Sequence, residues 1–260
     1  MNFLSMEDAE KSCLDMKKDS KKKIILFDID HTLYYSPELA EFEKELKRSE
    51  FIRIYNEENG SSEQNTSKAN SMFTHHLKKG RPICDLFVSH LAMGVDEYFY
   101  RYDDLEYDKY IKKDSELVEI FELLSQKFRI YAITNSSSLR CKKILELLEI
   151  SKFFDYVFCA KVLKFDNVDQ YLKFKKESKG EASNSASLDE KKRLLKPEKG
   201  AFLAVLRFIC NNDHKLIHFY DDINKNIIVA NEIGLIGTLV VNEDPTGEKC
   251  IKPLLNKLLA

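Results

Sequence analysis

The chain of 260 residues carries 41 Lys and Arg against 43 Asp and Glu, a formal net charge of −2 at pH 7. This balance argues against a general grip on nucleic acid through its phosphates. No segment approaches the ~20 apolar residues that a membrane-spanning helix needs, and the first 23 residues lack the apolar core of a secretory signal. Six cysteines without a C-x-x-C pair argue against a zinc site or a disulfide framework. We therefore expect a protein of the reducing cytoplasm, with the nucleus as an alternative, and no membrane or nucleic-acid partner.

The first half of the chain begins with an apolar run and continues with helical spacing. Residues 24–27 are typical of a buried parallel strand. Apolar residues at helical intervals predict a helix over 38–58, and the polar stretch 59–71 predicts a surface loop. Residues 72–111 are aromatic-rich and mostly helical. The helical sequence between the first two predicted strands, at 24–27 and 130–133, is too long for a simple crossover connection and indicates an inserted domain.

The second half alternates strands and helices. Asp114 is a candidate N-cap for a helix ending near Lys127, and Pro197 stands at a tolerated first position of a helix that ends near Cys210. The charged segment 164–195 indicates a partly disordered surface insertion. Strands are predicted at 130–133, 156–159, 216–220 and 237–241, with a further helix at 139–148. The alternation predicts an α/β fold with a doubly wound parallel sheet.

Acidic side chains directly follow two of the predicted strands. Asp28 and Asp30 come after the strand at 24–27, and Asp221 and Asp222 come after the strand at 216–220. Ligands of open α/β sheets bind at the carboxyl ends of the strands. Two acids at this edge, two residues apart, can hold a divalent cation and divide nucleophilic and acid/base work between them.

Taken singly, these residues have simpler explanations. An Asp pair after a strand commonly forms a turn, and Asp222 would cap a helix that starts near Ile223. Thr134, at the end of the strand 130–133, would also be a cap, and Lys196 would be a solvated surface lysine. Their order along the chain, each at the end of a strand or the start of a helix, favours one shared site.

Together these segments resemble the motifs of the haloacid dehalogenase (HAD) superfamily of phosphatases over nearly the whole chain. The segments are Phe27-Asp28-Ile29-Asp30-His31-Thr32-Leu33-Tyr34, Ile133-Thr134-Asn135, Lys196-Pro197 and Tyr220-Asp221-Asp222. The resemblance implies a Rossmann-like core at 21–37 and 113–260. It also implies a helical cap at 38–112, with 164–195 as a surface insertion within the core.

The resemblance assigns catalytic or phosphate-binding roles to five residues. Asp28 would be the nucleophile that forms an aspartyl-phosphate. Asp30 would act as general acid and then as general base, which contributes roughly 10²–10⁴-fold. The transferring phosphoryl group would be bound by Thr134, Asn135 and Lys196, with Thr134 and Lys196 counted as catalytic.

The resemblance also implies a Mg²⁺ cofactor. The Asp28 carboxylate and the Asp30 carbonyl would bind the ion, and Asp221 would complete the protein ligands, with waters filling the octahedron. Asp222 would join these ligands, or it would support Lys196 or a metal-bound water. The partner is then a small phosphorylated metabolite, and the oligomeric state, monomer or homodimer, stays open.

Within the superfamily, the chain is most similar to fungal-type pyrimidine 5'-nucleotidases. It shares Thr32-Leu33-Tyr34, Thr134-Asn135-Ser136 and Asn226 after the fourth motif. His31 departs from the Asn usual in that family. The resemblance implies hydrolysis of UMP or CMP, a nucleoside monophosphate. The alternatives are a phosphatase or phosphomutase for another small phosphate, such as a sugar phosphate, and a non-catalytic phosphate-binding regulatory protein. The intact Asp30 argues against the last, because a binder needs no general acid.

Overall fold

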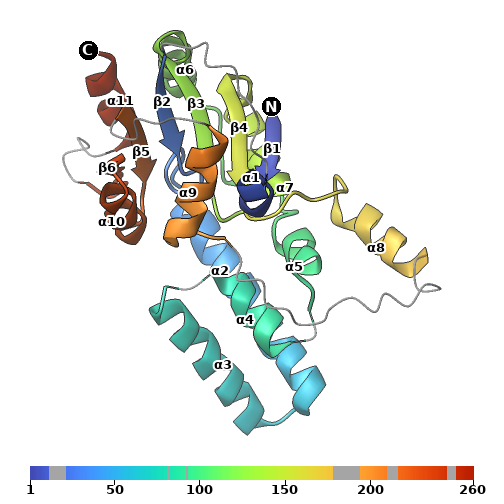
Figure 1. Cartoon of the computed structure of the whole chain (residues 1–260). Coiled ribbons are helices and arrows are strands. Elements are labelled where there is room, and N and C mark those ends of the chain that lie inside the picture. Colours follow the sequence, from blue (N-terminus) through green and yellow to red (C-terminus); the bar gives the residue numbers. More distant parts are fainter. Residues whose placement is uncertain (12–21, 81, 92, 178–193, 210–215, 245–249) are drawn as a thin grey trace. The chain divides into compact units, whose positions relative to one another are not determined.

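The fold is centred on a six-stranded sheet whose adjacent strands are all parallel (Figure 1). The computed structural model describes residues 1–11, 22–80, 82–91, 93–177, 194–209, 216–244 and 250–260. The strand order is β1-β4-β3-β2-β5-β6. The strands are β1 (Asn2–Ser5), β2 (Lys23–Phe27), β3 (Phe128–Ile133), β4 (Phe154–Cys159), β5 (Ile217–Asp221) and β6 (Ile236–Leu239). The prediction of a doubly wound α/β fold is confirmed.

The ends of the three central strands are level with one another. Phe27 of β2 is paired with Ala132 of β3 on one side and with Tyr220 of β5 on the other. The chain leaves β2, fills the β3 and β4 side, and then returns to place β5 on the opposite side of β2. Such a switch in direction opens a crevice at the carboxyl ends of the strands. The residues that follow β2, β3 and β5 therefore lie at one edge.

Contacts divide the chain into two compact units. The first contains Met1–Tyr35, Tyr107–Lys164 and Ser178–Ala260, and the second contains Ser36–Glu106 and Phe165–Glu177. The assignment of these units as core and cap stays a prediction. None of the helices in the described part of the chain is long and apolar enough to cross a membrane.

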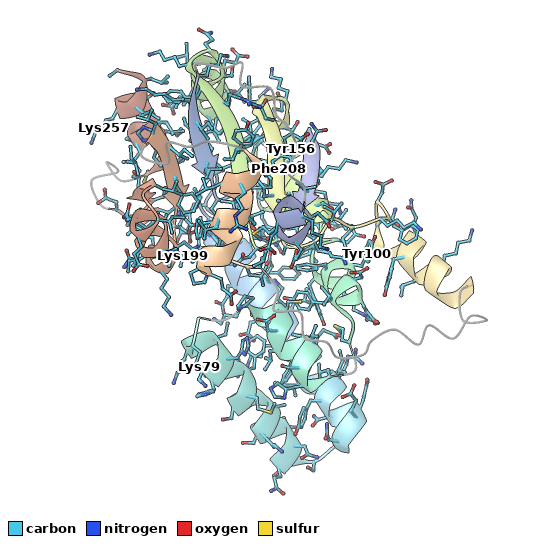
Figure 2. All side chains as sticks on the ribbon, in the orientation of Figure 1. Lys79, Tyr100, Tyr156, Lys199, Phe208 and Lys257 are labelled. Carbon is cyan, nitrogen blue, oxygen red and sulfur yellow. The ribbon has the colours of Figure 1, made fainter. Side chains whose placement is uncertain are left out.

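Helices flank the sheet of the first unit. They are α1 (Met6–Lys11), α6 (Ser115–Lys127), α7 (Ser138–Leu147), α9 (Lys199–Phe208), α10 (Asn224–Glu232) and α11 (Ile251–Leu259), with 3₁₀ turns η1 (Tyr107–Lys109) and η2 (Ser151–Phe153). Asp114 caps α6 as predicted, because its carboxylate accepts the backbone N–H of Leu117 at 3.1 Å. Phe208 of α9 packs edge-on against Tyr156 of β4, with ring centroids 5.1 Å apart (Figure 2).

Two sequence predictions in the first unit were wrong in detail. The helix expected from Pro197 begins two residues later, at Lys199, because a hydrogen bond of 2.8 Å from Glu198 N–H to the Leu195 carbonyl closes a turn first. No strand was predicted at the N-terminus, yet β1 pairs in parallel with β4, and α1 packs against α9. A four-residue strand has too little apolar alternation to stand out, and its partner lies about 150 residues away along the chain.

The second unit is helical. It contains α2 (Pro37–Asn59), α3 (Glu63–Lys78), α4 (Ile83–His90), α5 (Val95–Tyr102) and α8 (Val168–Glu177). The surface loop predicted at 59–71 was wrong, because most of it belongs to α3. Ser62 caps that helix by accepting the N–H of Asn65 at 3.1 Å, and Ala69 and Phe73, one turn apart, are buried. A narrow apolar stripe in a polar helix escapes a composition argument.

Helix α8 belongs to the second unit and not to the sheet-containing unit, where the insertion was predicted. The ring of Tyr171 in α8 stacks on Tyr100 of α5, with centroids 4.5 Å apart and an interplanar angle of 16°. The Tyr100 hydroxyl also accepts the backbone N–H of Phe165 at 2.6 Å. The start of the segment 164–195 is therefore docked through aromatic contacts. Residues 178–193 lie outside the described residues.

Candidate active site

The polar site residues lie at the carboxyl edge of the first unit's sheet. The N–H of Asp28 donates to the Tyr220 carbonyl at 2.8 Å, and the N–H of Thr134 donates to Phe158 at 2.9 Å. Each bond extends a strand ladder by one residue, so the backbone of each residue is fixed by the sheet. Asp221 is the last residue of β5. The sheet thus holds three predicted site residues on three neighbouring strand ends.

Lys196 joins two of the predicted acids. Its Nζ lies 2.8 Å from Asp28 Oδ1 and 2.6 Å from Asp221 Oδ2. All three side chains are buried, with 2%, 7% and 0% of their surface exposed. Burial alone would lower the pKa of Lys196, but the carboxylates of Asp221 and Asp28 raise it above its ordinary value. The lysine therefore stays charged, which is the form that attracts a phosphoryl group.

Asp28 and Asp222 have raised pKa values for the same reasons. Burial is the largest cause for both, and the neighbouring carboxylates add to it. Lys196 opposes the shift at Asp28, whereas His31 and Lys196 oppose it at Asp222. The site therefore has more negative charge than Lys196 alone offsets, and it favours a further cation.

Asp221 and Asp222 are held by contacts on both sides. The Asn226 amide donates to both Asp221 oxygens at 2.9 Å, and the backbone N–H of Ile223 donates to Oδ1 at 2.8 Å. The backbone N–H of Asp222 donates to the Thr32 hydroxyl at 3.1 Å. Thr32, fully buried, thus ties the turn after β2 to the end of β5. The N-cap of α10 is Ile223 and carries no side-chain cap bond, so Asp222 does not have the helix-capping role that was its simpler explanation.

Asp28, Asp221 and Asp222 form a donor set that fits a hard divalent cation. One carboxylate oxygen of each lies within 4.8 Å of the others. Mg²⁺ prefers oxygen ligands and keeps several waters beside one or two carboxylates. The side chain of Asp30 is not part of this cluster, and binding of the ion by the Asp30 carbonyl stays a prediction.

The Asp30 side chain contacts a separate set of polar residues. Arg140 donates through Nε and lies with Nη2 also 2.7 Å from Oδ1, Tyr34 donates to Oδ1 at 2.7 Å, and Ser136 donates to Oδ2 at 2.6 Å. Burial would raise the pKa of Asp30, but the Arg140 charge and the hydrogen bonds from Ser136, Tyr34 and Arg140 lower it to about 2. Asp30 is consequently a carboxylate at neutral pH.

Thr134 and Asn135 are at the site but have local partners. The Thr134 hydroxyl accepts the backbone N–H of Ser136 at 3.2 Å. The Asn135 amide donates to the Lys196 carbonyl and accepts the Lys196 N–H, both at 2.8 Å. This pair of bonds fixes the backbone that carries Lys196. The role of Asn135 as a phosphate ligand stays a prediction.

Sequence reasoning missed Arg140 and Ser136 as functional candidates. Arg140 lies on α7, where its neighbours Leu139 and Cys141 are buried, and it is itself only 4% exposed. A charged residue on the apolar stripe of a helix was the available signal. His31, which stands where the family usually has Asn, has a left-handed backbone conformation with a φ of 58°. Its carbonyl accepts a hydrogen bond from the side-chain amide of Asn242.

Comparison with known proteins gives one family and several distant structures. The haloacid dehalogenase-like hydrolase family matches residues 22–234. No curated protein matches.

Among solved structures, a HAD-family enzyme from Bacteroides thetaiotaomicron, in complex with magnesium and inorganic phosphate, is 14% identical over 86% of this chain and 98% of its own, with a TM-score of 0.43. A haloacid dehalogenase-like family protein from Streptococcus pneumoniae is 15% identical over 85% of each chain, with a TM-score of 0.44. An L-2-haloacid dehalogenase from Xanthobacter autotrophicus is 12% identical over 92% of this chain and 84% of its own, with a TM-score of 0.42. The family match spans most of the chain and includes every strand-end acid described above, and the chain belongs to the haloacid dehalogenase-like hydrolases.

Proposed function

We propose that this hydrolase is a Mg²⁺-dependent phosphatase that cleaves small phosphate monoesters through an aspartyl-phosphate on Asp28. The observation that carries the proposal is the position of Lys196 between Asp28 and Asp221, with Asp222 close by. A nucleophile, a fixed positive charge and a cation-binding donor set converge within a few ångströms. Phosphoryl transfer needs little more than this positioning and charge compensation.

In the first half-reaction, an oxygen of Asp28 forms a bond to phosphorus as the bond to the leaving oxygen breaks. Lys196 and Thr134 orient the phosphoryl group, and Lys196 offsets part of its negative charge. The leaving oxygen takes up a proton, which in this proposal comes from the protonated form of Asp30. The carboxylate form prevails in the free site at neutral pH, and the second half-reaction returns the proton to it. The products of this step are an alcohol and phosphorylated Asp28.

In the second half-reaction, Asp30 accepts a proton from water as the water oxygen bonds to phosphorus. The Asp28–phosphorus linkage then breaks, releasing inorganic phosphate and the free carboxylate. The low pKa of Asp30 keeps the group in the carboxylate form, the form that can accept a proton. A bound Mg²⁺, held by Asp28, Asp221, the Asp30 carbonyl and in part Asp222, would supply further charge compensation at the phosphoryl oxygens.

We propose further that the second unit serves as the cap and that the substrate is a pyrimidine nucleoside 5'-monophosphate. The resemblance of the motifs supports this substrate class. The aromatic residues of α5 do not supply a stacking surface, because Tyr98, Phe99, Tyr100 and Tyr102 are all at most 5% exposed and pack within the unit. Base recognition must therefore come from other groups, and hydrogen-bonding groups can discriminate by several powers of ten.

The nucleophile is tested by Asp28→Asn, which keeps the shape and removes the attacking charge. We expect p-nitrophenyl phosphate hydrolysis to vanish while the circular dichroism spectrum is preserved, and wild-type turnover to stop in EDTA and return with Mg²⁺. Asp155→Asn is the matched control, because Asp155 is ion-paired to Arg129 at 2.8 Å at the opposite end of the sheet. Substantial turnover by Asp28→Asn, or full activity in EDTA, contradicts the proposal.

The substrate is tested with nucleoside monophosphates and hexose phosphates under the same conditions. We expect kcat/KM for UMP and CMP to exceed that for AMP, GMP and hexose phosphates. If a sugar phosphate exceeds UMP and CMP by tenfold or more, the nucleotidase assignment fails. The chain is then a phosphatase or phosphomutase for another small phosphate.

A further inference from the structure

The Asp30 carboxylate is held by a group of side chains that the family motifs do not account for. Arg140, Tyr34 and Ser136 contact the side chain of Asp30, Tyr107 contacts Arg140, and all four residues lie in the first unit. Arg140 and Tyr107 are 4% and 1% exposed. A buried arginine is uncommon unless it is paired, and here it is paired with a residue of the proposed acid/base machinery.

The two carboxylate oxygens of Asp30 receive different numbers of hydrogen-bond donors. Oδ1 lies 2.7 Å from both Nε and Nη2 of Arg140 and 2.7 Å from the Tyr34 hydroxyl. Oδ2 accepts the Ser136 hydroxyl at 2.6 Å, its one hydrogen bond within the described residues. Oδ1 is therefore saturated with donors, whereas Oδ2 has acceptor capacity left for a proton.

Arg140 is itself held from two further directions. Its Nη1 donates to the Tyr107 hydroxyl at 3.2 Å, and its Nη2 donates to the Tyr34 hydroxyl at 3.1 Å. Its guanidinium carbon also lies 5.0 Å from the centre of the Tyr107 ring, a cation–π distance. The planar fork of arginine can meet these partners together, which a lysine cannot do. The fork is thus fixed before any substrate arrives.

We propose that Arg140 is a positioning residue that anchors Oδ1 of Asp30, so that Oδ2 is the oxygen that exchanges protons during catalysis. This inference rests on the proposed phosphatase function. Acid/base catalysis depends on the proton-accepting atom being within hydrogen-bond reach of its target. A displacement of about 1 Å can cost on the order of 10²-fold in rate. Arg140 would act through Asp30 and would not touch the substrate.

The two half-reactions allow a test that distinguishes positioning of Asp30 by Arg140 from a merely structural role of Arg140. The p-nitrophenolate leaving group departs without a proton, so phosphorylation of Asp28 by p-nitrophenyl phosphate should survive misplacement of Asp30. Attack by water on the phosphorylated enzyme needs the base and should be slowed. For Arg140→Met we therefore expect turnover to fall by about 10²-fold. Intact-protein mass spectrometry during turnover should show a larger fraction carrying one phosphoryl group than in the wild type.

Arg129→Met is the matched control. Arg129 is also paired with an aspartate at 2.8 Å and also lies over a tyrosine ring, at 5.3 Å, but it stands at the far end of β3. Its turnover and phosphorylated fraction should equal those of the wild type. If Arg140→Met does not fold, Arg140→Lys and Tyr107→Phe carry the same test, with smaller losses of turnover expected.

The outcomes separate this inference from the proposed function. An active wild type with an Arg140 variant within threefold of its turnover overturns the inference alone. The same holds for a folded variant that loses turnover without accumulating phosphorylated protein. A wild type that releases no phosphate and acquires no phosphoryl group overturns the proposed function and the inference together.

Discussion

Replacing Lys196 by methionine removes the cation that lies between the buried carboxylates of Asp28 and Asp221. The Lys196 Nζ is 2.8 Å from Asp28 and 2.6 Å from Asp221, and the Asp221 side chain is fully buried. Removing one member of a buried ion pair costs about 3–5 kcal/mol of unfolding free energy. Two carboxylates at the 4.8 Å limit of the cluster would repel by about 3.5 kcal/mol at an effective dielectric constant of 20. We therefore expect the metal-free variant to lose about 3–5 kcal/mol at pH 8.

The loss should depend on pH in a definite direction. Burial already raises the pKa of Asp28, and Lys196 is the group that opposes this shift. Without Lys196 the folded-state pKa rises further above the unfolded value of about 4. The folded variant then retains a proton that the unfolded chain releases, so its stability falls, relative to the wild type, as pH rises above about 4.

The assay is urea unfolding followed by circular dichroism at pH 5 and pH 8, in EDTA and in Mg²⁺. The Lys196→Met deficit should be smaller at pH 5. Added Mg²⁺ should stabilise the variant more than the wild type, because the ion can replace the missing charge. Lys199→Met, at an exposed lysine three residues along (Figure 2), should leave unfolding unchanged. A deficit below 1 kcal/mol at pH 8 in EDTA refutes the reasoning.

Three further predictions concern residues around the site and in the second unit. Asn226→Leu removes the amide that holds both Asp221 oxygens, so Mg²⁺ affinity measured by calorimetry should fall about 10–100-fold, and an unchanged affinity would separate Asn226 from the metal site. Asp114→Ala should lower the unfolding free energy by about 1 kcal/mol. Burial would raise the folded-state pKa of Asp114, but its partner Lys252 and backbone N–H bonds lower it. The stability difference between wild type and variant should therefore be present above about pH 4 and disappear at more acidic pH. Deletion of residues 174–190 should leave p-nitrophenyl phosphate turnover within a few-fold of the wild-type value. Tyr171→Ala should speed limited proteolysis of α8, because it removes the stacking of Tyr171 on Tyr100. Equal proteolysis rates in the variant and the wild type would show that this stacking does not hold the helix.

The strands and strand-end acids could be predicted from the sequence because their signals are local. Each central strand is an apolar run that ends at a polar site residue, and the strand register then brings these residues to one edge. The short strand β1 could not be predicted in this way, since its stability comes from pairing with β4. Helix α3 was missed because its polar composition concealed a single buried stripe, Ala69 and Phe73.

The site was predicted in part for a similar reason. Motif positions name the residues that touch the phosphoryl group, but they do not name the groups that hold those residues in place. Arg140 lies 110 positions from Asp30 along the chain, and only the fold brings the two together. The same holds for the Asn135 amide, whose two bonds to the Lys196 backbone span 61 positions. Supporting contacts of this kind depend on tertiary structure.

The division of the chain into two units constrains how it can fold during synthesis. The polypeptide passes between the units after residues 35, 106, 164 and 177. The second unit is therefore not a single insertion that can finish folding once residue 106 has emerged, because the stacking partner of Tyr100 is Tyr171. Nor can the first unit finish, because β5 pairs with β2 only after residue 217 is available. Both units are therefore incomplete while residues 107–177 are synthesised, and each contact that completes them closes a loop of 65 residues or more.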